Sequence, residues 1–174
     1  MVTTCINVEE DQVGLLIGKG GEVKKTIERM AGVTLKIEEC LVTIIGEDGF
    51  KVMKAGDVVK AISQGMPPKQ AFDLFGDDHQ LAVFDIEEVV TNQAALERQK
   101  ARIIGEKGKA KKFFEATLGL KIHIGDSKVT AVGSPEKLKV FREALERLVH
   151  GAPHSAVYRY VEARLAGLRA QNGI

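Results

Sequence analysis

The sequence predicts an α+β protein built from two copies of one small domain, each with the element order β-α-α-β-β-α. Residues 14–46 and 101–133 align without a gap, and eleven of the thirty-three aligned positions are identical, far more than chance gives. In both copies the apolar residues change from helical to alternating spacing at matching positions. A repeat of roughly 65–70 residues is the length of one supersecondary unit, so each copy is expected to pack a three-stranded sheet against three helices.

The first copy is predicted to contain six elements. Gly32 follows the second helix, as a left-handed C-terminal glycine would. Val33, Leu35 and Ile37 then alternate with polar residues, which predicts a strand with one buried face. In chain order the elements are a strand at Thr4–Val8, helices at Glu10–Ile17 and Glu22–Met30, strands at 33–37 and Leu41–Ile45, and a helix at Phe50–Ser63.

The second copy repeats this order. Ser134 is a candidate N-cap for the last helix, and Pro135 suits its first position. The expected elements are a strand at Val83–Val90, helices at Gln93–Ile104 and Lys109–Thr117, strands at Leu120–Ile124 and Lys128–Val132, and a helix at Pro135–Val149.

The two copies are separated by "GMPPKQAFDLFGDDHQ", where Pro67 and Pro68 stop the preceding helix. Lys69–Phe75 is expected to form one or two helical turns. After the second copy, the apolar spacing predicts a helix from about Ser155, which either packs on the second domain or docks a partner. The predicted organisation is a first domain at 1–66, a linker at 67–80, a second domain at 81–150 and a helical tail at 151–174.

Composition excludes several classes of protein. The longest apolar runs are far shorter than the roughly 18 residues of a membrane helix, and the N-terminus lacks the pattern of a signal peptide. Cys5 and Cys40 are far apart with no neighbouring His, so neither a metal nor a disulfide is expected. We therefore expect a cytoplasmic protein without membrane contact. Net charge is only +1, but residues 81–150 carry 13 Lys and Arg against 10 Asp and Glu.

Each copy carries the motif Ile-Gly-x-x-Gly between two predicted helices, as "IGKGG" and "IGEKG". Glycine accepts positive φ and lacks Cβ, so it permits a tight turn and a close approach of another backbone. The following helix begins with free N–H groups and a positive dipole end, which attract anions. With Lys19 in one loop and Lys107 in the other, the arrangement suits a sugar-phosphate backbone. The competing interpretation is that the glycines only make a tight helix–helix turn.

Other nucleotide-binding motifs fit poorly. A Walker A loop requires a different spacing with Ser or Thr after the Lys, and a Rossmann fingerprint must follow a strand. Recognition by exposed strand aromatics is disfavoured, because aromatic residues make up 5% of the chain and Trp is absent.

The helix-GxxG-helix motif within β-α-α-β-β-α resembles the type I KH domain, a single-stranded nucleic-acid module whose GxxG loop clamps about four nucleotides. The resemblance implies an apolar groove beside each loop, formed by Gly14, Ile17, Val23 and Ile37 and by Ala101, Ile104, Ala110 and Ile124. Lys36 and His123 occupy matching strand positions. The RNA-binding residues implied are Gly14, Ile17, Gly18, Lys19, Gly20, Gly21, Lys24, Lys25, Lys36 and Ile37 in the first copy, and Arg102, Ile104, Gly105, Glu106, Lys107, Gly108, Lys109, Lys111, Lys112 and Ile124 in the second.

The second half, with "ARIIGEKGKAKKFFEATLGLKIHIGDSKVTAVG" and the tail "HGAPHSAVYRYVEARL", is similar to the Dim-two family of ribosome-assembly factors, whose eukaryotic members are called partner of the Nob endonuclease. The intact "GKGG" resembles the archaeal branch. This resemblance implies binding to small-subunit rRNA, and contacts with the Nob endonuclease and the α subunit of translation initiation factor two.

The sequence therefore predicts a non-enzymatic single-stranded RNA-binding protein of ribosome assembly, without cofactor or metal. Two alternatives remain at this point: a regulator of mRNA or translation, and a protein–protein scaffold built on the same folds. A nucleotide hydrolase is a further alternative, which ATP binding would reveal.

Overall fold

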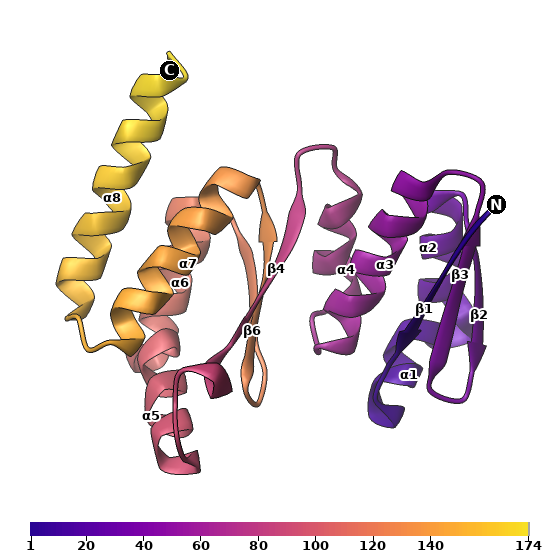
Figure 1. Ribbon diagram of the computed structural model, residues 1–174, viewed down its shortest axis with the longest axis horizontal. Helices are drawn as coiled ribbons and strands as arrows, with labels where there is room; N and C mark the ends of the chain where they lie inside the picture. The colour runs from indigo at the N-terminus through magenta and orange to yellow at the C-terminus, as the bar shows by residue number, and fades with distance from the viewer. Residues whose placement is uncertain (174) are drawn as a thin grey trace. The chain divides into compact units, whose positions relative to one another are not determined.

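The computed structural model describes residues 1–173, which form two compact units that divide between Leu81 and Ala82. Each unit holds one antiparallel three-stranded sheet, with strand order β1-β3-β2 in the first and β4-β6-β5 in the second. Helices cover one face of each sheet (Figure 1). The predicted α+β class with two tandem domains and a C-terminal helix is confirmed. Within the described part of the chain, no helix combines the length and apolarity needed to cross a membrane.

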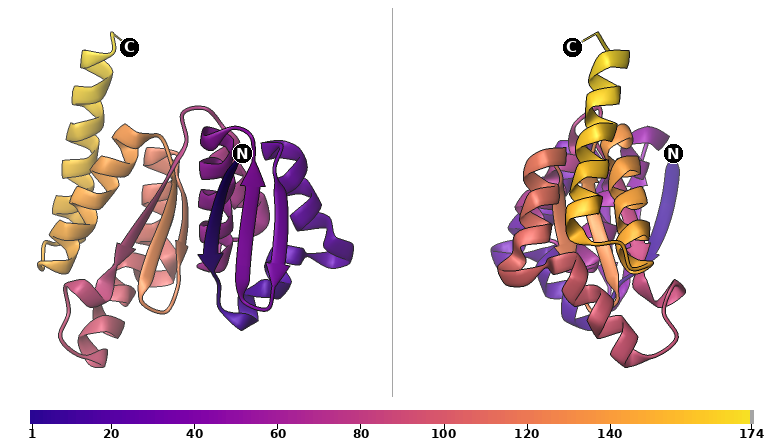
Figure 2. Two further views of the ribbon diagram at one scale, coloured as in Figure 1. Left: turned by 45° about the vertical axis from the view of Figure 1, so that its right-hand side comes forward. Right: turned by 90° about the vertical axis from the view of Figure 1, so that its left-hand side faces the viewer.

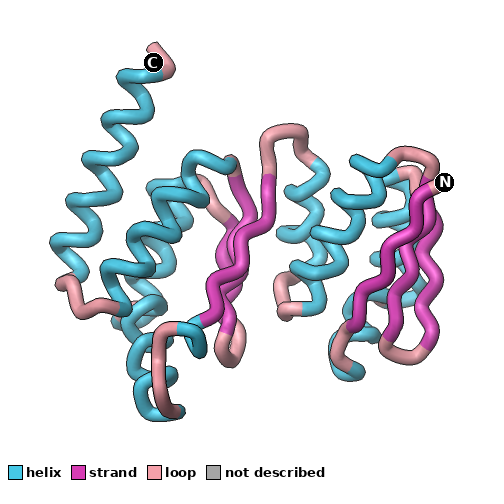
Figure 3. The backbone as a smooth tube through the Cα atoms, in the orientation of Figure 1, coloured by secondary structure: helices cyan, strands magenta, loops and turns pink. Residues whose placement is uncertain are grey.

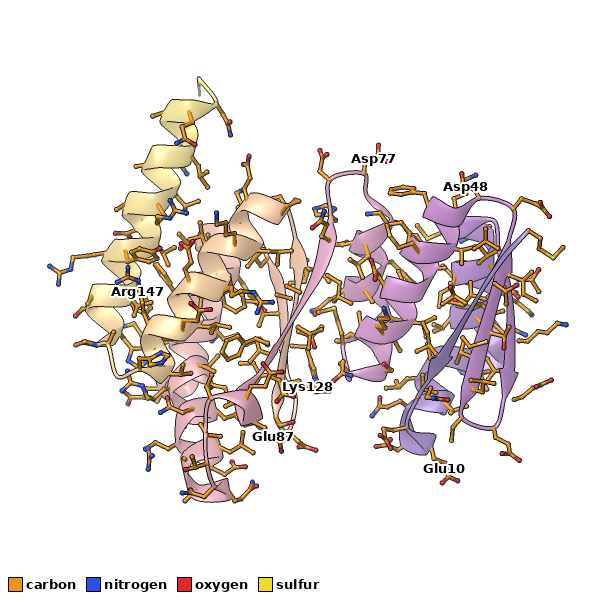
Figure 4. All side chains as sticks on the ribbon, in the orientation of Figure 1. Glu10, Asp48, Asp77, Glu87, Lys128 and Arg147 are labelled. Atoms are coloured by element: carbon orange, nitrogen blue, oxygen red, sulfur yellow. The ribbon has the colours of Figure 1, made fainter. Side chains whose placement is uncertain are left out.

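The first unit follows the predicted order. Asp48 caps its last long helix, with Oδ1 accepting from the backbone N of Phe50 at 2.9 Å (Figure 4). Gly32 ends the second helix in the left-handed conformation, as predicted. The elements are β1 (Val2–Asn7), α1 (Glu10–Ile17), the 3-10 turn η1 (Lys19–Gly21), α2 (Glu22–Ala31), β2 (Thr34–Glu38), β3 (Leu41–Gly46) and α3 (Gly49–Ser63).

Residues 67–80, interpreted from the sequence as a linker, are ordered and packed. They form α4 (Pro68–Ala71) and the 3-10 turn η2 (Phe72–Phe75), drawn as helix in Figure 3. Ala71 and Leu74 are fully buried, and both helical turns pack on α3. Lys54 of α3 fixes the end of the segment, because its Nζ donates to the carbonyl oxygens of Gly76 and His79 at 3.0 and 2.6 Å. The segment is thus part of the first unit.

The second unit repeats the order and adds a long final helix. Asn92 caps its first helix, with Oδ1 accepting from Ala95 N at 2.8 Å. Ser134 stands at the N-cap of α7 as predicted, but its hydroxyl makes no capping hydrogen bond. The elements are β4 (Gln80–Asp85), η3 (Ile86–Glu88), α5 (Gln93–Ile104), η4 (Glu106–Gly108), α6 (Lys109–Leu118), β5 (Lys121–Ile124), β6 (Lys128–Gly133), α7 (Pro135–Val149) and α8 (His154–Gln171).

The strand predicted at Val83–Val90 is wrong in its second half. β4 ends at Asp85, whose carboxylate accepts from Glu87 N at 3.0 Å and so caps the 3-10 turn η3. The local side-chain-to-backbone bond competes with the sheet ladder here, although the apolar pattern favours a strand. Phe84 and Ile86, on either side of Asp85, therefore belong to different elements, the strand and the turn, although both lie in the core.

Candidate nucleic-acid interface

The two GxxG loops, Gly18–Gly21 and Gly105–Gly108, adopt the same backbone conformation. Their first glycines have φ/ψ of 72/174° and 76/170°, and their last glycines have 75/17° and 75/15°. The N–H of the last glycine donates to the carbonyl of the first at 3.1 Å in both loops. The third position is left-handed in both, with φ of 62° at Gly20 and 53° at Lys107.

The first glycine of each loop is required by the protein's own packing. A Cβ at Gly18 would lie 2.5 Å from Val23 Cγ2, and one at Gly105 would lie 2.6 Å from the backbone N of Ala110. By contrast, nothing lies within 4 Å of a Cβ built at Gly20. The first glycine is therefore explained by the tight helix–helix turn alone, without a ligand. The later loop positions instead leave open space over the loop, where a ligand could lie.

The helices that follow the loops, α2 and α6, begin without a side-chain cap. The first N–H of each helix donates back to the preceding 3-10 turn, from Glu22 to Lys19 O and from Lys109 to Glu106 O. What favours an anion at these ends is therefore the positive end of the helix dipole. The two ends differ in charge, since α2 begins with Glu22 and α6 with Lys109. Positions 18–22 carry Lys19 against Glu22, whereas positions 105–109 carry Lys107 and Lys109 against Glu106, so an anion is attracted more strongly to the second loop.

Most of the predicted cationic residues are open to solvent. The exposed ones are Lys19, Lys25, Lys36, Lys107, Lys109 and Lys112. Lys24 and Lys111 are half-buried, and Lys111 Nζ lies 3.7 Å from Glu115 Oε1. Arg102 differs from the rest, because its Nη2 donates to the carbonyl of Ala152 at 2.5 Å. Arg102 is therefore directed to the chain itself and not to the loop surface.

The apolar residues predicted to line the two grooves are only partly brought together. Ile17 is 38% exposed and Ile37 is half-buried, and their counterparts Ile104 and Ile124 are both half-buried. Ala110 is fully buried, because its methyl group faces Gly105 beneath the loop. Ala110 is thus a support of the loop, and the second groove is lined without it.

Two glutamates for which the sequence predicted no role bond to the outer edges of β2 and β5, beside the grooves. Glu28 Oε1 accepts from Leu35 N at 2.8 Å, and Glu115 Oε1 accepts from Ile122 N at 3.3 Å. These amides point away from β3 and β6, so by the alternation of an antiparallel ladder the backbone groups of Ile37 and Ile124 also face the open edge of their strands. Glu28 and Glu115 are one of the identical pairs of the repeat, and this was the sequence signal that could have pointed to their shared role.

His123 stands on β5 at the position that Lys36 occupies on β2. Burial, with a smaller contribution from the nearby cations Lys111 and Lys100, lowers the pKa of His123 below its usual value. At neutral pH the imidazole is therefore neutral beside a basic surface.

We expect RNA affinity to rise as pH falls through the lowered pKa of His123, because the ring then adds a positive charge close to the groove. Because the pKa of His123 is lower in the folded chain than in the unfolded chain, the unfolded chain binds this proton more readily. The His123 contribution to stability is thus retained above about pH 6.5 and lost as pH falls through the folded-state pKa. Fluorescence anisotropy with single-stranded RNA between about pH 7.5 and 5 measures the first effect. A His123→Gln variant with the same pH dependence as the natural chain would refute it.

Comparison with known protein families follows the two units. A family model described as "Eukaryotic type KH-domain (KH-domain type I)", that of the second KH domain of PNO1, matches residues 80–166, and one described as "KH domain" matches residues 3–61. The KH domain-containing protein MJ0443 of Methanocaldococcus jannaschii is 39% identical over 162 residues, which cover 90% of this chain and 71% of that protein. The pre-rRNA-processing protein PNO1 of Debaryomyces hansenii is 33% identical over 64% of this chain, but only 44% of PNO1 is spanned.

Solved structures agree over nearly the whole chain. Dim2p of Pyrococcus horikoshii superposes with a TM-score of 0.87 at 31% identity, covering 94% of this chain and 99% of Dim2p. The chain matched in the a/eIF2alpha–aDim2p–rRNA complex of the same organism gives a TM-score of 0.86 at 32% identity, with coverages of 94% and 93%. A protein of unknown function from Aeropyrum pernix gives 0.94 at 34%, with coverages of 98% and 94%.

Two type I KH folds, each with an intact GxxG loop, define a tandem KH-domain protein. More particularly, the chain belongs to the PNO1/Dim2 family. Membership of this family of RNA-binding proteins confirms the prediction that the chain is not an enzyme.

Proposed function

We propose that this protein binds single-stranded RNA through both GxxG loops, and that its target is small-subunit rRNA during ribosome assembly. The observation that carries the proposal is the shared geometry of the two loops. Each has the same backbone conformation, an uncapped helix N-terminus behind it and an exposed lysine on it.

A single strand makes two kinds of contact at each site, one through its phosphates and one through its bases. Its phosphates lie over the open loop, where the positive dipole end of α2 or α6 and the exposed lysines offset their charge. Its bases enter the groove beside Ile17 and Ile37, or Ile104 and Ile124. There the edge-strand N–H and C=O groups are free to pair with base edges, as unstacked bases in RNA-binding modules require.

The identity of the target is supported by the relatives. Several are named pre-rRNA-processing proteins, and the solved complex from P. horikoshii holds rRNA and a/eIF2alpha together with aDim2p. For the present chain we propose the same class of RNA, with the α subunit of translation initiation factor two and the Nob endonuclease as protein partners. A cytoplasmic site of action, as expected from the sequence, is part of the proposal.

Single-stranded RNA is expected to bind at least about tenfold more tightly than duplex RNA of equal length, because only unpaired bases can enter an apolar groove. Competition between the two at moderate salt, followed by anisotropy, measures the ratio. Equal affinities would mean that a basic surface holds phosphates without base contacts, and the KH mode of binding would be excluded.

A further inference from the structure

The C-terminal helix α8 packs within the unit that carries the second loop. It lies along α7 and also contacts α6 (Figures 1 and 2). Val157, Val161 and Leu165 are buried in the core of this unit. The ring centres of Tyr158 and of Phe113 in α6 lie 4.0 Å apart, and Cζ of Arg147 in α7 (Figure 4) lies 3.8 Å from the centre of the Tyr160 ring. Since α6 begins at the second loop, α8 supports the helix that follows this loop.

A pair of hydrogen bonds joins the start of α8 to α5, the helix that leads into the loop. Arg102 Nη2 donates to Ala152 O at 2.5 Å, and His154 Nε2 lies 2.8 Å from Arg102 O. A carbonyl only accepts, so the histidine donates. Arg102 lies in the last turn of α5, where carbonyls lack a partner within the helix, and His154 supplies one. We call these two bonds the α5–α8 clasp.

The side chain of Arg102 is half-buried at the clasp. Its Nε is buried and has no hydrogen-bond partner among the described residues, while Nη2 is engaged by Ala152. Three residues further on, Gly105 begins the loop, and its N–H donates to Ala101 O at 2.8 Å. The clasp therefore acts on the helical turn from which the loop starts.

The first unit has the same extension but lacks the clasp. Gly65 and Gly151 have φ of 99° and 97°, each is followed two residues later by a proline, and η2 packs on α2 as α8 packs on α6. In the repeat, however, Leu15 occupies the place of Arg102. A segment packed behind the helix that follows the loop is common to both units, but among the described residues only the second unit adds the polar clasp.

We propose that Arg102 and His154 are positioning residues, which hold the last turn of α5 so that Gly105–Gly108 keeps its RNA-binding conformation. This inference rests on the proposed RNA-binding function. It assigns Arg102 a role through the loop, in place of the direct phosphate contact that the sequence suggested, and it gives α8 a task within its own unit.

The test uses the full chain with Arg102→Leu, which introduces the first unit's residue, and with His154→Ala. Both are expected to lower affinity for single-stranded RNA about fivefold, the effect of one lost hydrogen bond, and to speed amide hydrogen exchange at the second loop in the free protein. The dependence of affinity on salt should stay unchanged in both. His154→Gln retains an N–H donor and should behave as the natural chain. Arg98→Leu removes an exposed charge of the same helix and should leave loop exchange unchanged.

Two results would overturn the proposal. A salt slope lowered by about 0.7 in Arg102→Leu, with His154→Ala binding normally, would show a direct phosphate contact. Unchanged loop exchange in folded His154→Ala would show that the clasp does not hold the loop, and this variant decides the matter alone if Arg102→Leu fails to fold. The exchange measurement needs no RNA, so it still tests the clasp if the natural chain proves not to bind RNA.

Discussion

Replacing Gly105 with alanine is expected to lower the unfolding free energy of the second unit by about 3 kcal/mol or more. Its φ and ψ of 76° and 170° fall in a region that is essentially restricted to glycine. The added Cβ would also lie 2.6 Å from the backbone N and 2.8 Å from the Cβ of Ala110. Ala110 is fully buried and cannot move aside cheaply. Urea denaturation followed by circular dichroism measures the loss.

Gly108 provides the matched control for this prediction. Its φ is also positive, at 75°, but a Cβ there would meet nothing closer than Lys112 Cε at 3.9 Å. Gly108→Ala should therefore cost only the left-handed penalty, about 1–2 kcal/mol. If the two variants are equally stable, the close approach of α6 to Gly105 is not what requires glycine at the start of the loop.

Lys107→Asp is expected to weaken RNA binding by about tenfold or more, and to flatten its salt dependence more than Lys19→Asp combined with Gly20→Asp. The reason is local charge. The second loop opens onto α6, which begins with Lys109, whereas the first opens onto Glu22. Each phosphate contact on a single strand contributes about 0.7 to the salt slope. Titrations at several salt concentrations compare the two variants.

The left-handed conformation of Lys107, with φ of 53°, supplies a control that separates charge from loop geometry. Lys107→Gly creates the residue found at the same loop position in the first unit. It should raise stability by about 1 kcal/mol by relieving the backbone, and yet weaken RNA binding because the amine is lost. Abolished binding in the first-loop pair, with Lys107→Asp unaffected, would show instead that the more glycine-rich first loop dominates.

Local signals made the element order predictable from the sequence. Alternating Val33, Leu35 and Ile37 and the glycine at 32 mark a strand and a helix end that need no distant partner. Because the same pattern occurs twice in the repeat, each copy supported the interpretation of the other. Both GxxG loops lie between the two helices that the sequence predicts around them. Only at Ile86 did the local bond of Asp85 override the apolar pattern.

The remaining features depend on contacts between distant residues. Arg102 looks like part of a basic run, but its partner Ala152 is fifty residues away and belongs to a turn that the run does not reveal. Ala110 matches a groove position in sequence, yet Gly105 covers it. The segment after α3 appears as a linker because of its two prolines, and only packing of Ala71 and Leu74 on α3 shows otherwise.

The most direct test of the account is the affinity of the full chain for a single-stranded fragment of small-subunit rRNA, measured with both loops altered together. The combined variant carries Lys19→Asp, Gly20→Asp and Lys107→Asp. All three positions are exposed, and Asp tolerates the left-handed conformation of positions 20 and 107 better than most residues, so circular dichroism should show a folded protein. Because tethered sites reinforce each other, each loop alone should retain weak binding, and the combined variant should lose about 100-fold or more in affinity. A folded combined variant that binds as tightly as the natural chain would contradict RNA binding through the GxxG loops.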